Sequence, residues 1–299
     1  MVNTIAMYMP LLHGLLKVAG MRSQAVVLEP GTTINFWVPT ETTDKPVVVF
    51  LHGFGLNGIL KWQFQVLSFA RTYAVYVPNF LFFGGSITDK PYRSPVFQAE
   101  CIAKSLRKLG VESCSLVGLS YGGMAGFKMA EMYPDLVKSM VVTGSVIALT
   151  ESITRAGLER IGFSSWAEYL IPRTIKGVKD MLDIAIYKLP WIPNFVFEDV
   201  LEVMFDNRKE RMELLEALIT KDKDFTVPDY SQKIHLLWGE DDRIFNLEVA
   251  HNLKEQLEGK TKLHYIEKAV HLPSLERPFV YNILLKKLFA SLHEDRQQQ

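Results

Sequence analysis

The chain has 299 residues, which suits one large α/β domain carrying an inserted segment. Apolar residues make up 48% and charged residues 22%, a globular composition that excludes a disordered chain. Lys and Arg together number 33, as do Asp and Glu, so no net charge directs the chain to nucleic acid. The two cysteines, Cys101 and Cys114, form neither a disulfide framework nor a metal-binding cluster, and this low usage favours a reducing, cytoplasmic location.

The first 22 residues are predicted to form an N-terminal helix, because Leu11, Leu12, Leu15 and Leu16 recur at helical spacing. The segment lacks the basic leading region and the small-residue cleavage site of a signal peptide. No stretch of the sequence is apolar for the roughly 18 residues that a membrane span needs. Two interpretations stay open: a helix packed on the body, or an interfacial helix in peripheral contact with a membrane.

Strand and helix patterns alternate along most of the remaining chain. Two strands at 24–28 and 32–38 flank a Pro30-Gly31 turn. Short apolar runs, typical of buried parallel strands, follow at 47–51, 74–77, 115–119, 139–142, 234–238 and 263–266. Amphipathic helical patterns cover 62–71, 98–109, 121–133, 247–258 and 279–293. The alternation predicts an α/β fold with a mostly parallel sheet covered by helices on both faces.

One segment breaks this alternation. From 147 to 225 the sequence has helical patterns punctuated by Pro172, Pro190 and Pro193, and no convincing strand. We therefore expect a helical cap at 147–225, inserted into an α/β core formed by 23–146 and 226–299.

The pentapeptide Gly118-Leu119-Ser120-Tyr121-Gly122 joins a predicted strand to a predicted helix. A serine at the apex of such a sharp turn is held away from the backbone, where its hydroxyl can reach a substrate carbonyl. Glycines flank it because a side chain at either place would clash in so tight a turn. Ser120 is therefore the candidate nucleophile.

A nucleophilic serine also needs hydrogen-bond donors where negative charge develops on the substrate oxygen. The loop His52-Gly53-Phe54-Gly55 directly follows the predicted strand 47–51. We expect the backbone amides of Phe54 and Tyr121 to form this oxyanion hole.

The serine further requires a base and a carboxylate that orients the base. Glu240, Asp241 and Asp242 follow the predicted strand 234–238, and their spacing alone does not choose among them. His271 lies just past the last predicted strand, after the serine and the acid in chain order, which makes it the candidate base.

This order of Ser120, acid and His271, with the His-Gly-Phe-Gly loop and the turn at 83–86, resembles the α/β-hydrolase fold family. The resemblance covers nearly the whole chain and is especially to lid-bearing serine hydrolases of plants, which are grouped with epoxide hydrolases and monoacylglycerol lipases. It implies an eight-stranded sheet, and it points to Asp242 as the acid, which the family carries in a Gly-x-x-Asp pattern. Val270 stands where the family usually has Gly and Asn79 where it often has Asp, so the pocket is expected to differ in shape.

Within this family, enzymes that attack an epoxide or haloalkane carbon carry Asp at the elbow, whereas a serine attacks carbonyls through an acyl-enzyme. The resemblance thus implies hydrolysis of a carboxylic ester or thioester of a hydrophobic small molecule, in lipid metabolism. Two alternatives stay open. One is a non-hydrolytic enzyme on the same triad, such as an acyl transferase or a lyase of specialised metabolism. The other is a ligand-binding receptor of the same fold.

Five aromatic side chains are predicted to line an apolar substrate pocket: Phe54, Phe82, Phe83, Trp166 and Phe195. The competing interpretation is that cap helices need apolar faces simply to pack on the core. We expect no cofactor, no metal and no nucleic-acid partner, and a protein that is a monomer or a weak dimer.

Overall fold

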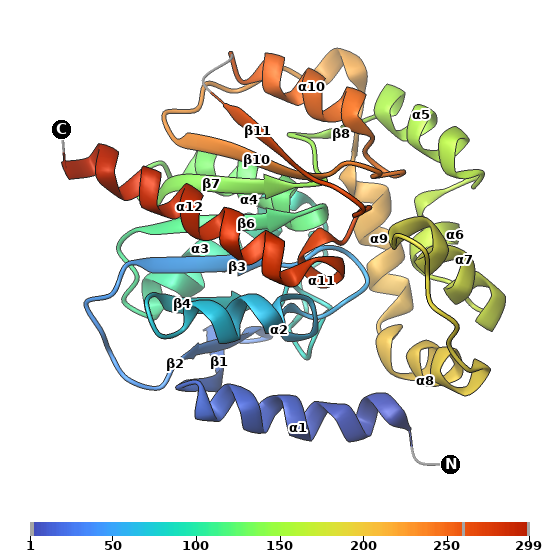
Figure 1. Ribbon diagram of the computed structural model, residues 1–299, viewed down its shortest axis with the longest axis horizontal. Coiled ribbons are helices and arrows are strands. Elements are labelled where there is room, and N and C mark those ends of the chain that lie inside the picture. The colour runs from blue at the N-terminus through green and yellow to red at the C-terminus, as the bar shows by residue number, and fades with distance from the viewer. Residues whose placement is uncertain (1–2, 259–260, 298–299) are drawn as a thin grey trace.

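A mostly parallel sheet runs through the molecule (Figure 1). The computed structural model describes residues 3–258 and 261–297, with side chains up to residue 292. Eight strands lie in the order β1-β2-β4-β3-β6-β7-β10-β11, and a short ninth strand, β5, pairs with β2. Neighbours from β4 to β11 are parallel, whereas β2 pairs antiparallel with β1, β4 and β5. The strands are β1 (Met21–Glu29), β2 (Thr32–Pro39), β3 (Val47–Leu51), β4 (Ala74–Pro78), β5 (Ile87–Thr88), β6 (Cys114–Leu119), β7 (Val137–Thr143), β10 (Lys233–Gly239) and β11 (Lys262–Ile266).

The central strands are the apolar runs of the sequence. All of β6 is buried, as is almost all of β3, β7 and β10, because helices cover the sheet on both faces. The predicted mostly parallel sheet is therefore confirmed. The strand β5 was not predicted, because two residues are too few to show the alternating apolar and polar pattern of a strand.

Helices lie on both sides of this sheet (Figure 1). α2 (Gly58–Phe69) and α12 (Pro278–Gln297) pack together on the near side, and α3 (Pro95–Lys108) and α4 (Tyr121–Met132) pack together on the far side. α10 (Leu247–Gln256) packs on β10 and β11, and the short α11 (Pro273–Glu276) contacts α2. α2 begins earlier than predicted, because the Asn57 side chain caps it by accepting the Leu60 N–H.

The N-terminal helix α1 covers Thr4–Val18 and ends before the predicted residue 22, because Met21 and Arg22 already belong to β1. Residues 1–2 of the predicted span lie outside the described residues. Its own side chains Leu12 and Leu16 are buried, and the helix contacts β1, α2 and α8 (Asn194–Met204). Across the described residues, no helix combines the length and apolar character that crossing a bilayer requires.

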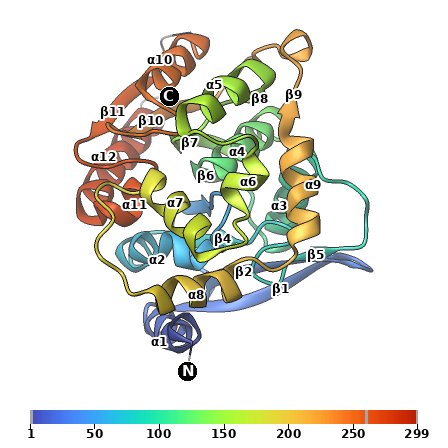
Figure 2. The ribbon, with the colours of Figure 1, turned by 90° about the vertical axis from the view of Figure 1, so that its right-hand side faces the viewer.

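The segment 147–225 is helical, and it lies beyond one end of the sheet (Figures 1 and 2). Besides α8 it holds α5 (Glu151–Ile161), α6 (Trp166–Leu170), α7 (Ile175–Ala185), α9 (Arg208–Leu218) and a 3₁₀ turn at Asp222–Asp224. The expectation of no strand here was wrong: β8 (Leu149–Thr150) and β9 (Ile219–Thr220) pair in parallel and join the two ends of the segment. Two residues are too few to leave a strand period in a sequence.

Arg211 ties this helical segment to the core. The side chain, on α9, is only 3% exposed; its Nε donates to the carbonyl of Phe82 at 2.9 Å and its Nη1 to the carbonyl of Met204 at 2.6 Å. The guanidinium also pairs with Asp206 and lies 4.1 Å from the centroid of the Phe83 ring. Its donors thus satisfy buried carbonyls of both parts of the chain.

We expect Arg211→Met to lower the free energy of unfolding by roughly 3 kcal/mol, because the buried carbonyls and Asp206 lose their donor. Urea unfolding followed by circular dichroism measures the change. Lys209→Met, at an exposed position on the same helix, is the matched control and should be nearly neutral. Equal losses of unfolding free energy in the two variants would show that the hydrogen bonds of Arg211 do not stabilise the fold.

Candidate functional site

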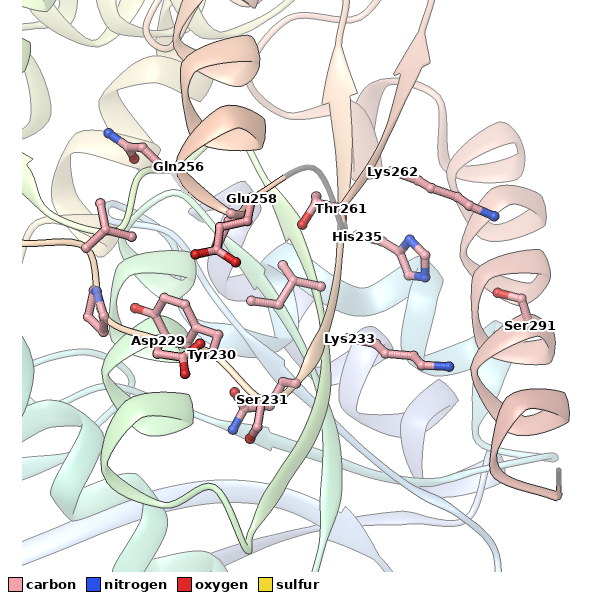
Figure 3. A pocket seen from close by; sticks show the side chains of 15 residues that line it. Asp229, Tyr230, Ser231, Lys233, His235, Gln256, Glu258, Thr261, Lys262 and Ser291 are labelled. Carbon is pink, nitrogen blue, oxygen red and sulfur yellow. The ribbon is translucent and has the colours of Figure 1, made fainter. Parts of the chain in front are cut away.

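Two cavities are candidates for a ligand, and they lie at opposite ends of the parallel strands. One, of about 780 Å³, is lined by polar side chains that include Lys233, His235 and Lys262, at the amino ends of β10 and β11 (Figure 3). Ligands of open parallel sheets bind at the carboxyl ends of the strands, so this cavity is at the wrong end. None of the residues that the sequence predicts for the site lines it.

The other cavity, of about 300 Å³, lies at the carboxyl ends. Ser120, His271, Gly53 and Phe54 line it from core loops, and mostly apolar side chains of α6, α7 and α8 line it from the helical segment. A small adjoining cavity, of about 30 Å³, is also lined by Ser120 and His271. Within the described residues, no group of three or more His, Cys, Asp or Glu side chains is arranged to hold a metal ion.

The aromatic residues predicted for the pocket divide into two groups. Phe54 lines both cavities and Trp166 lines the smaller one. Phe82 and Phe83 are buried and line neither cavity; Arg93 lies over the ring of Phe82 and Arg211 over that of Phe83. Phe195 also lines neither; it lies on α8 and is partly exposed to solvent. Phe82 and Phe83 are therefore packed in the interior and Phe195 lies at the surface, and none of the three is part of a cavity wall.

Ser120 lies at a strained turn between β6 and α4. Its backbone has φ 53° and ψ −121°, a conformation that non-glycine residues seldom adopt. The turn is held because the Ser120 N–H donates to the Thr143 carbonyl at 3.0 Å and the Ser145 hydroxyl donates to the Ser120 carbonyl at 2.7 Å. A side chain at Gly122 would clash with the Leu51 carbonyl, so α4 can approach β3 this closely only with glycine there.

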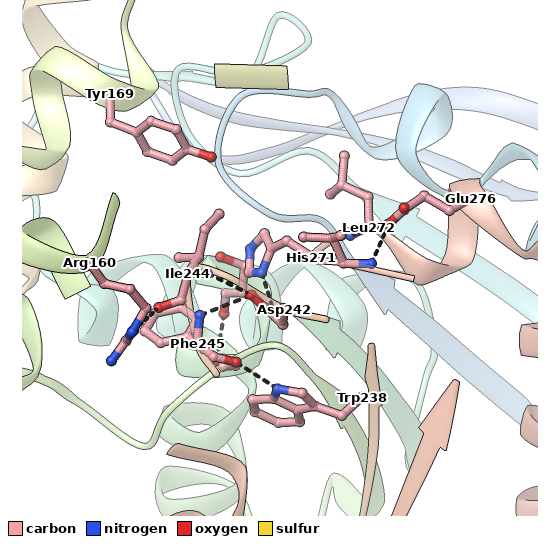
Figure 4. A network of polar contacts seen from close by, with 12 residues as sticks. Arg160, Tyr169, Trp238, Asp242, Ile244, Phe245, His271, Leu272 and Glu276 are labelled. Atoms are coloured by element: carbon pink, nitrogen blue, oxygen red, sulfur yellow. Dashed lines mark hydrogen bonds and ion pairs between the residues drawn. The ribbon is translucent and has the colours of Figure 1, made fainter. Parts of the chain in front are cut away.

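His271 is held by Asp242 (Figure 4). The imidazole Nδ1 lies 2.9 Å from Asp242 Oδ2, and the carboxylate is fully buried. The other oxygen, Oδ1, accepts the N–H groups of Ile244 and Phe245 at 2.9 and 3.0 Å. With Nδ1–H donating to the carboxylate, Nε2 carries the lone pair of the neutral ring. Asp241, by contrast, is exposed, so the carboxylate beside His271 is that of Asp242.

Ser120 and His271 share the wall of both cavities at this end of the sheet. Within the described chain, no hydrogen bond joins the Ser120 hydroxyl to the His271 ring. The loop that follows β3 lies against the serine, since a Cβ on Gly53 would be 3.4 Å from Ser120 Cβ. The structure therefore brings together the serine, the histidine, the aspartate and the glycine loop.

Comparisons with known proteins agree with this geometry. The family model described as the alpha/beta hydrolase fold matches residues 46–165. The structure also superposes on that of a membrane phospholipase A, a bacterial virulence factor, with a TM-score of 0.80 and 21% identity over 96% of this chain and 91% of that one. The chain therefore has the α/β-hydrolase fold.

Two curated relatives of this α/β-hydrolase-fold protein are named as hydrolases. Epoxide hydrolase 4 of Homo sapiens is 23% identical over 280 residues, which cover 81% of this chain and 71% of that protein. A 2-hydroxy-6-oxononadienedioate/2-hydroxy-6-oxononatrienedioate hydrolase of Burkholderia vietnamiensis is 27% identical over 235 residues, which cover 75% of this chain and 80% of that protein. These similarities support a hydrolase.

Glu276 is a residue of the hydrolase-fold site that the sequence analysis missed. Its Oε1 accepts the N–H groups of Val270 and Leu272, on either side of His271, at 3.0 and 3.2 Å (Figure 4). Its Oε2 accepts the N–H of Tyr187, just after α7, at 2.6 Å. Burial raises the pKa of Glu276. Its partners are backbone groups, which leave no trace in a sequence.

His52 and Asn79 shape the glycine loop and the turn beside it. Buried His52 donates from Nδ1 to the Gly53 carbonyl at 2.8 Å and accepts the Phe80 N–H at Nε2 at 3.0 Å; burial lowers its pKa to about 4. Asn79 accepts the Gly58 N–H at 2.8 Å and donates to the Gly84 carbonyl at 3.3 Å. An ionised aspartate could not donate to Gly84, which explains the amide at this position.

Lys61 is a buried lysine in the wall of the cavity of about 300 Å³. The residue is 1% exposed, and its Nζ donates to the hydroxyl of Ser274 at 2.6 Å. Burial lowers its pKa to about 7, against the partial compensation of Glu276. Between pH 7 and pH 10, Lys61 is therefore protonated in the unfolded chain and largely deprotonated in the folded protein. In this pH range the free energy of unfolding rises with pH.

We expect Lys61→Met to remove this part of the rise in stability and to raise the free energy of unfolding most near pH 7 and below, where the wild-type protein must bury a charge. Urea unfolding between pH 6 and pH 10 measures it. Lys209→Met, at an exposed lysine, should leave the pH profile of the wild type unchanged. A Lys61→Met profile parallel to that of the wild type would contradict a lysine that loses its proton on folding.

Proposed function

We propose that the protein hydrolyses a carboxylic ester or thioester of a hydrophobic small molecule, with Ser120 as nucleophile, His271 as base and Asp242 as the acid that orients it. The observation that carries the proposal is the position of His271. Its ring is hydrogen-bonded at Nδ1 to buried Asp242, and it faces the same cavity as the strained serine. A nucleophile, a base and a third group that orients the base are the parts that acyl transfer requires.

In the proposed reaction the Ser120 hydroxyl attacks the substrate carbonyl while His271 Nε2 accepts its proton. The ester bond then breaks, His271 returns the proton to the leaving alcohol, and an acyl group remains on Ser120. Water, deprotonated by the same imidazole, attacks the acyl-enzyme; the bond to Ser120 breaks, His271 returns the proton to the serine oxygen, and the acid leaves. Asp242 stabilises the imidazolium in both steps. Hydrogen bonds of this kind are often long in free enzymes and tighten when substrate binds, so the serine–histidine bond is expected to form then.

Negative charge on the carbonyl oxygen needs donors, and we assign this role to the amides of Phe54 and Tyr121. Neither amide has a hydrogen-bond acceptor in the described part of the chain. Phe54 follows Gly53, whose backbone lies against the serine, and Tyr121 directly follows the serine at the start of α4. Each donor of an oxyanion hole contributes roughly 3 kcal/mol to transition-state stabilisation.

The cavity supports a hydrophobic substrate of modest size. Its volume of about 300 Å³ is at the lower end for small-molecule sites, and its wall is largely apolar: Leu56, Leu60, Leu170, Met181, Leu182, Val200 and Met204 contribute to it. Although one relative is named an epoxide hydrolase, the elbow of this chain carries a serine, and a serine hydroxyl favours carbonyl attack.

We expect a fluorophosphonate probe to label the wild-type protein covalently and to leave Ser120→Ala unlabelled, because the probe reacts with an activated serine hydroxyl. Gel fluorescence and intact mass measure the adduct. Ser23→Ala, at an exposed serine of β1, is the control and should still be labelled. An unlabelled wild-type protein would contradict the proposed enzyme and would favour a ligand-binding receptor of this fold.

A second assay separates hydrolysis from transfer. If acyl transfer to added alcohols were faster than release of the acid, the protein would be a transferase and not a hydrolase.

We expect Asp242→Asn to lower kcat for a short-chain aryl ester by about 10⁴. The asparagine oxygen would accept from the N–H groups of Ile244 and Phe245, so its NH₂ would face Nδ1 and impose the other tautomer on the imidazole. Asp241→Asn, the neighbouring exposed carboxylate, should leave kcat nearly unchanged. Steady-state rates of the two variants at matched protein concentration decide between them. A large loss in Asp241→Asn with an active Asp242→Asn would reverse the assignment.

A further inference from the structure

The N-terminal helix α1 is apolar on both faces. Its inner face carries the buried Leu12 and Leu16, which pack on the body. Its outer face exposes one stripe at helical spacing: Met7, Leu11, Leu15 and Val18, with Leu11 61% and Val18 90% exposed. A helix on the surface of a soluble domain ordinarily turns polar residues outward. The outer face therefore lacks a covering partner within the described chain.

The exposed apolar surface continues from α1 onto α2 and α12. Phe64 and Leu67 are exposed on α2, and Phe279 and Ile283 are exposed on α12, with Phe279 83% exposed. Side-chain hydrogen bonds link the three helices, from Tyr8 to Gln63 and, at 2.9 Å, from Gln65 to Asn282. Both ribbon views place α1, α2 and α12 along the same side of the molecule (Figures 1 and 2). We call this surface the three-helix face.

Over most of its length the three-helix face carries basic residues and no acidic ones. The stretches 4–18, 58–69 and 278–293 contain no Asp or Glu, and Glu294 and Asp295 follow near the end of α12. Four exposed basic side chains lie on these helices or directly after α2: Lys17, Arg71, Lys286 and Lys287. Acidic residues begin at the rim, on α8, where Asp199 accepts hydrogen bonds from Thr4. An apolar surface edged with cations complements a bilayer whose head groups are anionic.

The cavity at Ser120 reaches this face. Ile5 and Tyr8 of α1 and Leu60 and Gln63 of α2 are part of its wall, and Tyr8 is itself exposed. A hydrophobic ligand could thus pass between a membrane and the cavity beside these helices without crossing water. A second copy of the chain bound to the same face would cover this route.

From these observations we propose that the three-helix face docks on anionic phospholipid bilayers, with the wall of the cavity at the membrane surface. The apolar stripes enter the interface between head groups and acyl chains, and Lys17, Arg71, Lys286 and Lys287 contact anionic head groups. Docking needs no turnover, so it stands or falls independently of the hydrolytic reaction proposed above.

Flotation of the full chain with phosphatidylcholine vesicles, prepared with and without phosphatidylserine, tests the proposal. Wild type and the Ser120→Ala variant should both float with the phosphatidylserine vesicles and much less with phosphatidylcholine alone, and added salt should weaken binding. Leu11→Ser should reduce the partition coefficient about tenfold, because an inserted leucine is lost. Lys287→Gln should reduce it about fivefold, and only on the anionic vesicles.

Matched controls lie across the molecule from α2 and α12, on β5 and α9 (Figure 2). Ile87→Ser alters an apolar residue that is 55% exposed, and Lys209→Gln alters an exposed lysine; both should float like wild type. The proposal is overturned if wild type does not float, or if the control variants lose as much binding as the variants of the three-helix face. It is also overturned if Leu11→Ser converts a dimer into a monomer in light scattering while flotation is unchanged, since the face would then bind a second copy.

Discussion

The site depends on the hydrogen bond between His271 and a carboxylate that has no access to water. Both oxygens of Asp242 are engaged, Oδ2 by the imidazole and Oδ1 by the N–H groups of Ile244 and Phe245. A buried carboxylate held by three donors has little freedom to rotate. The imidazole is consequently fixed in one tautomer, and Nε2 is the nitrogen left with a lone pair. The loop after β10 and the loop after β11 meet at this bond, so the order of strands in the sheet determines that it can form.

The same loop is fastened to the helical segment, so the two parts of the chain are coupled at the site. The His271 N–H donates to the Ala185 carbonyl at 3.1 Å, and Glu276 accepts from Tyr187 on one oxygen and from the residues flanking His271 on the other. A displacement of the end of α7 would therefore pull on the backbone of the histidine. This makes Glu276 a positioning residue for His271. Any opening of the segment at 175–187 has to break these bonds or carry the histidine loop with it.

The sequence predicts those features whose signals are local. β3 lies at 47–51 as expected, because a buried strand in a parallel sheet is a continuous apolar run bounded by turns. The turn at Ser120 was recognisable because its glycines are required by close backbone contacts. Spacing alone could not choose between Asp241 and Asp242, because neighbouring residues after a strand differ only in the direction of their side chains. The preference for Asp242 came from the family resemblance. The roles of Glu276 and Lys61 could not be predicted from the sequence. Glu276 accepts from backbone N–H groups, which every residue type shares, and Lys61 donates to a serine more than two hundred residues away. Phe195 was misplaced, because a helical period shows that a face is apolar without showing what lies opposite it.

The two interpretations of the N-terminal helix need not compete, because they concern different faces of it. Leu12 and Leu16 account for the packing on the body, and a helix that only needed to pack would be stabilised by polar residues on its outer side. Met7, Leu11, Leu15 and Val18 instead leave that side apolar. The same pattern recurs on α2 and α12, whose exposed Phe64, Leu67, Phe279 and Ile283 come from parts of the chain that are distant in sequence. Three segments that bring exposed apolar side chains to one surface beside a cavity are better explained by a shared partner than by the separate packing of each helix.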